Sequence, residues 1–556
     1  MILNRRARRI GAVLAGVACV ALATACSGSS SSGGGANGSA KNVSLTLYTG
    51  ATGQLPNNFN PYGASPTRAA DGMIYETLMF FNLGKSGPPQ PVLATAYTWS
   101  ADGKTLKFTL RSGVQWSDGQ PLTAKDIAFT FNLRKKYKAL NQYGVPYDNA
   151  TADDDTHVTI TFTRPAFTDL WYIAGQSYML PEHTWSKVAD PTTFPDTKPM
   201  GSGPYLLNTY NSQNFTLKKN PHYWQPGKPE VSSIRFISLS GNTSSLTALQ
   251  SGQVDWQSSF IPKLQQVWGS KAPTNNWINT PLYQTELTAN MDRFPTNDKA
   301  VRQALYYGVD RQQLNNIAFD NQASETNCAL ALQPRDNSWV DQSLPNLKPV
   351  YDPAKSQALL EADGWAKGSD GIYAKGGKRL SMTIKVVSGY TDYISALQTM
   401  QQQYQKVGIE LKPQQQSYAS YTADRGSGNF DLVIDSVYGG PTPYYLYNSF
   451  LNSANTAPIG KQALPNFARY RNPAVDAALA QVAGTNDPAL QKAGYATIQK
   501  QICDDMPYVP LIQNSTLTEF RTDKVTGFPT KDNLYAIPAV YQVPDLAIVA
   551  TNLKVK

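Results

Sequence analysis

The chain has 556 residues, which is too long for one ordinary domain and predicts about three. Hydrophobic residues make up 41% and charged residues 16%, a globular composition that excludes a disordered chain. The net charge of +9 falls to +5 without the first 25 residues, and no run of Lys or Arg forms a basic stripe, so we expect no nucleic-acid partner.

The N-terminus is predicted to be a signal peptide over residues 1–25. Arginines at positions 5, 6, 8 and 9 precede an apolar run, Ile10 to Ala25, that is too short for a comfortable membrane span. The run ends in Ala23-Thr24-Ala25-Cys26, which resembles a bacterial lipobox and predicts lipidation of Cys26. Residues 26–41 then form a Ser/Gly tether. We therefore expect an exported lipoprotein on the outer face of a bacterial cytoplasmic membrane; the alternative for Cys26 is a cleaved or buried thiol.

The first elements after the tether are short. Asn42 to Leu47 alternates as a strand, and residues 58–61 (Asn-Phe-Asn-Pro) form a turn-rich loop. Residues 73–81 are predicted to form a short amphipathic helix.

The stretch from Leu93 to Leu133 contains two Asp-Gly turns around an alternating strand. Leu106, Phe108 and Leu110 fall on one face of that strand. Thr123 and Asp126 have the spacing of a capping box and predict the start of a helix.

Further elements follow by the same signals. Strands are predicted at residues 158–162, 408–411 and 430–434. Thr296 to Arg311 has an apolar helical face, and a second helix should begin after Asp352 and end at Gly364.

Few residues suggest covalent chemistry. Besides Cys26, which is predicted to be lipidated, the mature chain keeps Cys328 and Cys503, and an even pair in an exported protein favours a disulfide over two separate thiols. The three histidines, His157, His183 and His222, lack metal-ligand spacing. No nucleophile motif occurs, so we expect neither a metal, nor a cofactor, nor an enzyme.

Taken in order, the motifs resemble those of family 5 extracellular solute-binding proteins, the receptors of ABC importers. The resemblance rests on six stretches: residues 93–133, 201–205 (GSGPY), 220–224 (NPHYW), 296–311 (TNDKAVRQALYYGVDR), 351–365 (YDPAKSQALLEADGW) and 525–529 (VTGFP). It implies an α/β, periplasmic-binding-protein-like type II fold, with two lobes, a hinge and three domains.

The resemblance also implies domain boundaries. Domain I would comprise residues 42–80, 201–295 and 511–556; domain II residues 81–200; domain III residues 296–510. Hinge crossings are expected near residues 201–202 and 290–296, with a return near Pro510. A monomer should close its lobes around a small molecule and deliver it to the transmembrane subunits of an ABC permease.

The ligand class stays open between oligopeptides and oligosaccharides. Peptide receptors of this family place an Asp in the loop that corresponds to residues 435–445, where it pairs with the ligand's ammonium group. Here Gly440 to Pro443 replaces that motif, so the acidic anchor is missing unless Asp435 substitutes for it. The tyrosines of the loop resemble the oligosaccharide-binding branch, such as cellobiose receptors. A hydrolase with a spatially assembled triad, or a sensor on the same fold, are the other hypotheses.

The candidate ligand-binding residues lie in loops that this family directs at its cleft. They are Asn58, Phe59, Trp256, Asn290, Asp435, Tyr438, Gly440, Thr442, Tyr444 and Gln513.

Overall fold

The computed structural model describes residues 42–556, apart from 51, 52 and 64. The predicted signal peptide, Cys26 and the tether lie outside the described residues. We keep the domain names for the residue ranges given above.

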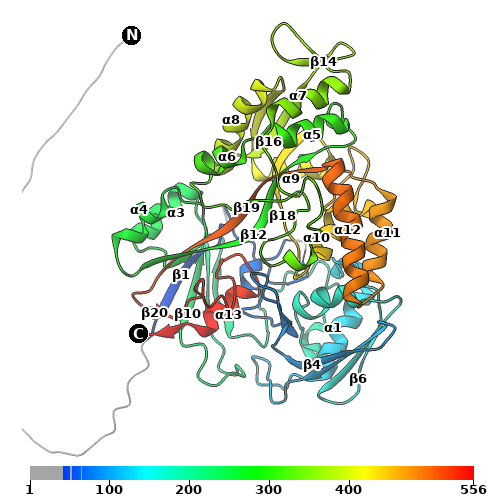
Figure 1. The fold of residues 1–556 in the computed structure, drawn as a ribbon. Helices are drawn as coiled ribbons and strands as arrows, with labels where there is room; N and C mark the ends of the chain where they lie inside the picture. The colour runs from blue at the N-terminus through cyan, green and yellow to red at the C-terminus, as the bar shows by residue number, and fades with distance from the viewer. Residues whose placement is uncertain (1–41, 51–52, 64) are drawn as a thin grey trace, which may run out of the picture. The chain divides into compact units, whose positions relative to one another are not determined.

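A ten-stranded mixed sheet organises the described chain (Figure 1), and two long strands occupy its middle. β12 (Asn275–Ala289) and β19 (Tyr508–Arg521) pair antiparallel, with register irregularities between Pro281 and Tyr283 and between Thr285 and Glu286. These strands connect the domain III part of the sheet with the domain I part. The domain III strands are β18 (Leu432–Val437), β16 (Ser381–Val387) and β17 (Glu410–Gln416); the domain I strands are β11 (Trp256–Gln257), β1 (Ser44–Tyr48), β10 (Ser233–Ile237), β9 (Asn214–Lys219) and β8 (Tyr205–Asn211).

Domain II contributes a separate antiparallel sheet in the order β4-β5-β7-β6. Its strands are β4 (Ala94–Trp99), β5 (Thr105–Leu110), β6 (Tyr147–Ala152) and β7 (His157–Phe162). Leu106, Phe108 and Leu110 of β5 are buried and Lys107 is exposed, so the predicted alternation is confirmed. Helix α1 (Ala124–Lys136) packs against β6 and β7. The predicted capping box is also confirmed, because the Asp126 carboxylate accepts a hydrogen bond from the Thr123 amide at 2.9 Å.

Domain III is mostly helical outside the large sheet. Within residues 296–311 the predicted helix covers Lys299–Tyr307, and a second helix begins at Arg311, where the Asp310 side chain accepts a hydrogen bond from the Gln313 amide. The helix that starts after Asp352 is confirmed, and Gly364 follows it at φ +84°. The helices are α5 (Lys299–Tyr307), α6 (Arg311–Ala318), α7 (Pro353–Ala362), α8 (Thr391–Lys406), α9 (Tyr418–Ser427), α10 (Pro443–Leu451), α11 (Pro473–Ala483) and α12 (Pro488–Asp505).

The remaining elements are short. They are the helices α2 (Glu182–Trp185), α3 (Asn242–Gln250), α4 (Leu264–Val267) and α13 (Asp545–Asn552), and the strands β2 (Met79–Phe80), β3 (Gln90–Pro91), β13 (Ala366–Lys367), β14 (Tyr373–Lys375), β15 (Lys378–Arg379), β20 (Val525–Thr526) and β21 (Lys554–Val555).

The predicted helix over residues 73–81 is wrong. These residues form turns and strand β2, and all of them are buried, so the chain has no solvent-facing side there. Glu76 accepts hydrogen bonds from Ser202 Oγ at 2.8 Å and from Trp224 Nε1 at 3.0 Å. A Cβ atom on Gly201 would lie 1.8 Å from the Ile74 carbonyl oxygen. The glycine is therefore required where the chain returns from domain II into domain I.

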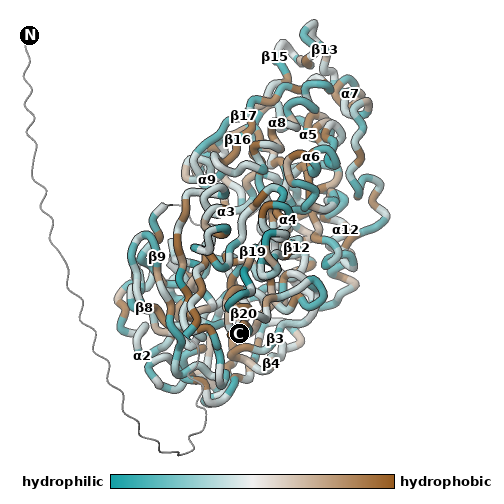
Figure 2. The backbone as a smooth tube through the Cα atoms, turned by 90° about the vertical axis from the view of Figure 1, so that its left-hand side faces the viewer, coloured by the Kyte–Doolittle hydropathy of each residue, from teal (hydrophilic) through white to brown (hydrophobic). Residues whose placement is uncertain are grey.

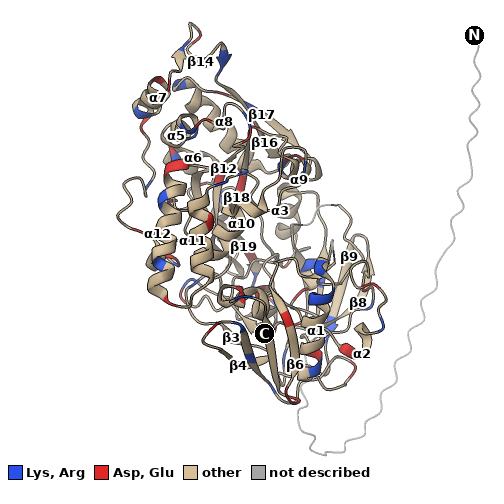
Figure 3. Ribbon diagram, turned by 90° about the vertical axis from the view of Figure 1, so that its right-hand side faces the viewer, with Lys and Arg blue, Asp and Glu red and all other residues tan. Residues whose placement is uncertain are grey.

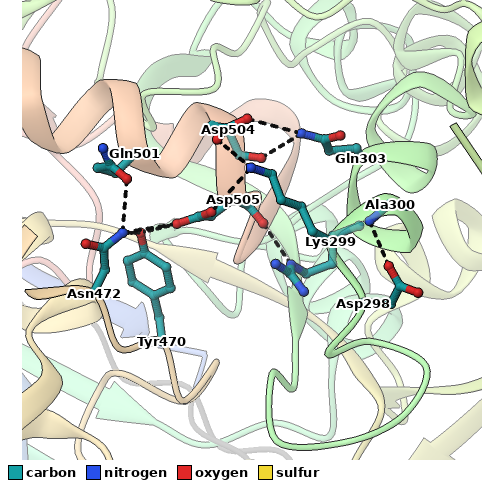
Figure 4. Close-up of polar contacts among 10 residues, drawn as sticks. Asp298, Lys299, Ala300, Gln303, Tyr470, Asn472, Gln501, Asp504 and Asp505 are labelled. Carbon is teal, nitrogen blue, oxygen red and sulfur yellow. Dashed lines mark hydrogen bonds and ion pairs between the residues drawn. The ribbon is translucent and has the colours of Figure 1, made fainter. Parts of the chain in front are cut away.

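Domain III contains an internal disulfide bond. A disulfide joins Cys328 to Cys503 of α12 inside its hydrophobic core. Beside it, Lys299 of α5 forms an ion pair of 2.5 Å with Asp504, and Tyr470 donates a hydrogen bond of 2.7 Å to Asp505 (Figure 4). The end of α12 is thus held by α5 and by the loop before α11.

Hydropathy and charge follow the fold. Hydrophobic and hydrophilic stretches alternate along the chain (Figure 2). Basic and acidic residues are interspersed over the ribbon (Figure 3). Among the described residues, no helix combines the length and hydropathy that a bilayer span requires.

Candidate functional site

The first pocket lies where domain III meets β12. Leu282 and Gln284 of β12 line it, together with the loop that follows β18 and with α10. Arg335 and Asp336 form an ion pair at 2.8 Å on another side of it, and Arg335 donates a hydrogen bond of 3.0 Å to the Leu83 carbonyl of domain II. The pocket therefore lies close to a contact between domains.

Tyr438, a predicted ligand residue, lies at this pocket and is 53% exposed. Its ring contacts Tyr283 edge to face, with 5.5 Å between centroids. Although solvent reaches Tyr438, the surrounding protein desolvates its phenol and raises its pKa, while Arg68 lowers that pKa.

Other tyrosines share this environment and come from all three domains. Tyr143 lies within electrostatic range of Tyr438, and so does Tyr418. Tyr418 lies within the same range of Tyr390, and Tyr541 contacts Tyr283. We call this set the tyrosine cluster: Tyr143, Tyr283, Tyr390, Tyr418, Tyr438 and Tyr541. All but Tyr283 are between 38% and 61% exposed.

Asp435 is the predicted substitute for the missing ammonium anchor, but it already forms an ion pair within the protein. Arg425 pairs with its carboxylate, and the Ser436 amide donates a hydrogen bond to it at 2.8 Å. Glu286 faces Asp435 across the β12–β18 pair and is fully buried. Burial and the neighbouring Asp435 raise the pKa of Glu286 well above its usual value. Near neutral pH this group of three residues is close to electrically neutral.

The loop of Gly440 to Tyr445 forms the contact between domains III and II. The Trp171 amide donates a hydrogen bond of 3.2 Å to Tyr445 Oη, and the two rings pack edge to face at 5.0 Å. A Cβ atom on Gly440 would lie 2.5 Å from the Trp171 ring. Tyr444 is buried, and Thr442 is half-buried at the start of α10. These predicted residues lie at the domain contact, and only Tyr438 of this region is openly exposed.

Four predicted ligand residues are buried with partners inside the protein. Phe59 packs edge to face with Phe215, and Trp256 donates a hydrogen bond of 2.8 Å to the Pro538 carbonyl. The Asn290 amide donates to two backbone carbonyls, and Gln513 bonds to Gln333 and neighbouring side chains. In this structure they leave almost no side-chain surface for a ligand. Asn58 is half-buried, and its side chain accepts from the Asn60 amide within the loop.

The second pocket lies between domains I and II, and sequence reasoning did not find it. Arg68 and Tyr62 of domain I line it with Arg134, Tyr143 and Tyr178 of domain II. The positive charge of Arg68 lowers the pKa of Tyr438 in domain III, so Arg68 acts electrostatically on a residue of the first pocket. Arg68 belongs to no motif, and nothing in the sequence would have singled it out.

Metal ligation finds no support in the geometry. Among the described residues, no three His, Cys, Asp or Glu side chains gather in a way that could hold an ion. The tyrosines, amides and arginines present are groups for noncovalent recognition.

Comparisons with known proteins agree with this assembly. Residues 88–458 match the family described as bacterial extracellular solute-binding proteins, family 5 middle. The glutathione-binding protein GsiB of Shigella flexneri is 29% identical, over 86% of this chain and 91% of that protein. The periplasmic oligopeptide-binding protein of Thermotoga maritima has the same fold, with a TM-score of 0.84 at 24% identity, over 93% of this chain and 100% of that one. Its mannohexaose-bound structure gives 0.79 at 25% identity, over 93% and 99%.

The predicted family and its α/β periplasmic-binding-protein fold are therefore confirmed. The chain belongs to the bacterial extracellular solute-binding proteins of family 5.

Proposed function

We propose that this chain is a lipid-anchored receptor of an ABC importer that captures oligosaccharides between its lobes and delivers them to the permease. The observation that carries the ligand class is the tyrosine cluster. The exposed aromatic faces of its tyrosines come from three domains, and Tyr438 lies at the first pocket. Such faces pack on the apolar faces of sugar rings, and their hydroxyl groups bond to sugar hydroxyls.

The charges at the cleft argue against a peptide. A bound α-ammonium group needs a free carboxylate, because an unpaired buried cation is costly. Arg425 already forms an ion pair with Asp435. The pKa of Glu286 is raised, which favours the neutral form of the Glu286 side chain. Asp392 is the remaining acidic group beside Tyr390; burial raises its pKa to about 6, and no cation forms an ion pair with it among the described residues. It is the carboxylate that a peptide would use.

The relatives support both ligand classes. A similar Thermotoga maritima protein has been crystallised with mannohexaose. Glutathione, bound by GsiB, is a peptide. The tyrosine cluster decides the proposal in favour of sugar.

The test is a thermal-shift screen of the mature domain from Ser27 without lipid. Cello- and manno-oligosaccharides should stabilise it, whereas glutathione and di- to pentapeptides should not. A ligand at 100 times its Kd adds about 2.7 kcal/mol. If peptides alone stabilise the domain, and Asp392→Asn abolishes that effect, the sugar proposal is wrong. If the protein cleaved a sugar or a peptide of the screen and released the products, that turnover would contradict a receptor function.

A further inference from the structure

The second pocket carries more positive charge than the surrounding protein neutralises. Arg134 lies on α1 and is 1% exposed. It donates hydrogen bonds to the Leu140 carbonyl at 3.2 Å, to Tyr147 Oη at 3.0 Å and to Ser177 Oγ. All three acceptors are uncharged, and among the described residues no carboxylate lies within ion-pair distance of Arg134. Its guanidinium also lies over the Tyr62 ring, 5.0 Å from the centroid. Arg302 and Arg469 are also buried on backbone carbonyls without an ion pair, so what distinguishes Arg134 is that it lines a pocket.

Arg68 adds a second positive charge at the mouth of the same pocket. Its side chain is exposed, and within the described part of the chain it makes neither a hydrogen bond nor an ion pair. Asp71 is the nearby acid on the same segment. Burial raises the pKa of Asp71 to about 8, although Arg68 lowers it, so this side chain is mostly protonated at neutral pH. Asp71 therefore leaves the charge of Arg68 almost unopposed.

Two buried polar atoms in this region also lack partners. Tyr178 Oη lines the pocket on a side chain that is 4% exposed, and it has no hydrogen-bond partner. Asp71 Oδ2 is likewise buried without one. Unsatisfied buried polar atoms are uncommon, and in a pocket they indicate a ligand that supplies the missing partner. Here the free hydroxyl, the protonated carboxyl and the two guanidinium groups are all hydrogen-bond donors.

We infer that the pocket formed by Arg68, Arg134, Tyr143 and Tyr178 is a subsite for a carboxylate at one end of the transported ligand. The inference rests on the proposed function and refines it: the preferred oligosaccharide ends in a uronic acid. Because the charge of Arg68 acts on the pKa of Tyr438, the proposal places the sugar rings of the ligand on the tyrosine cluster and its carboxylate at Arg68. Donors from a phenol and a guanidinium match the acceptor geometry of a carboxylate. A peptide C-terminus offers the same chemical group, and the experiment separates the two sources.

The test uses pairs of ligands that differ only in the acid. Cellobiouronic acid is compared with cellobiose, and trialanine with trialanine amide, by titration calorimetry on the lipid-free mature chain. Wild type should bind the acidic sugar about 10- to 100-fold more tightly than the neutral one, which is the range for a charge-assisted hydrogen bond. Arg68→Gln should remove that preference and leave the affinity for cellobiose unchanged. Tyr178→Phe should reduce the preference by a smaller factor.

Arg235→Gln is the matched control, since Arg235 is an exposed arginine on β10 that lines neither pocket. The Arg68 side chain makes no hydrogen bond within the described part of the chain, so the unfolding midpoint of the variant should equal that of wild type. Equal affinity for both sugars would overturn the carboxylate subsite and leave the sugar receptor standing. Retention of the acid preference in Arg68→Gln would also overturn it. Selective binding of free trialanine, lost in Arg68→Gln, would keep the subsite and overturn the sugar assignment.

Discussion

The arginines beside the candidate site in domain III differ from those of the second pocket, although Arg302 and Arg469 elsewhere in domain III are also buried on carbonyl oxygens without an ion pair. In domain III, Arg425 pairs with Asp435, and Arg335 with Asp336. Across the cleft, Arg134 is buried on neutral acceptors, and Arg68 has no ion-pair partner among the described residues. These ion pairs hold parts of domain III together, and the attraction between the two charges offsets part of the hydration that they lose. Arg134 is held by hydrogen bonds inside the protein, whereas the Arg68 side chain makes none among the described residues, so Arg68 is the charge that a partner from outside would neutralise.

The largest expected effect is loss of the disulfide that closes domain III. Cys328 and Cys503 are 175 residues apart, and such a loop strongly restricts the unfolded chain. Cys328→Ser with Cys503→Ser should lower the free energy of unfolding by about 4 kcal/mol. Denaturant unfolding measures it, and wild type in reductant is the control. A loss below about 1 kcal/mol would mean that packing alone holds α12 in place.

The next effect comes from breaking the charge pair of domain III. Arg425→Met leaves Asp435 facing Glu286 without a cation. Both members of the pair are about one-fifth exposed, so we expect a loss of about 2–3 kcal/mol, less than for a fully buried pair. Denaturant unfolding of Arg425→Met should show this loss. Adding Asp435→Asn should restore part of it; no recovery would show that Arg425 acts through its packing on Phe467 instead.

Asp71 makes the stability of the folded chain depend on pH. Its folded pKa of about 8 exceeds the unfolded value, so between about pH 4 and pH 8 the folded chain holds a proton that the unfolded chain has released. This carboxyl group therefore lowers stability as pH rises through that window. From pH 5 to pH 8, the free energy of unfolding of Asp71→Asn should rise by about 2 kcal/mol relative to that of wild type. One proton can change this free energy by at most about 1.4 kcal/mol per pH unit, so the expected difference lies within that limit. The exposed Asp532→Asn is the control, and parallel pH curves for both variants would refute the prediction.

The smallest effect tests the tyrosine cluster. Tyr438→Ala should weaken binding of the preferred oligosaccharide by about 10-fold, roughly the value of one aromatic contact. Because Tyr438 is 53% exposed, stability should change little. Tyr351→Ala is the matched control: Tyr351 is 42% exposed and lines neither pocket. Equal affinities of the two variants in calorimetry would remove Tyr438 from the site.

Local chemistry explains which features the sequence could predict. A capping box is complete within four residues, so Thr123 and Asp126 were sufficient to place α1. The face that a side chain presents depends on elements far along the chain. Trp256 and Gln513 are predicted from loops that should face the cleft, yet both lie on strands that direct their side chains into the interior. Residues 73–81 have a local pattern that predicts an amphipathic helix, but distant elements bury them on all sides and the chain forms turns and β2. Arg68 and Tyr143 belong to different domains, and only the fold brings them to one pocket.

The two register irregularities of β12 and β19 have a kinetic consequence. At these points, between Pro281 and Tyr283 and between Thr285 and Glu286, the hydrogen-bond ladder between the strands is interrupted. Twisting the sheet there breaks fewer backbone hydrogen bonds than twisting it elsewhere. If the lobes separate by this twist, amide deuterium uptake at these residues would record each opening event. The dwell time of a captured molecule would then depend on the backbone of two strands as well as on the groups that contact the ligand.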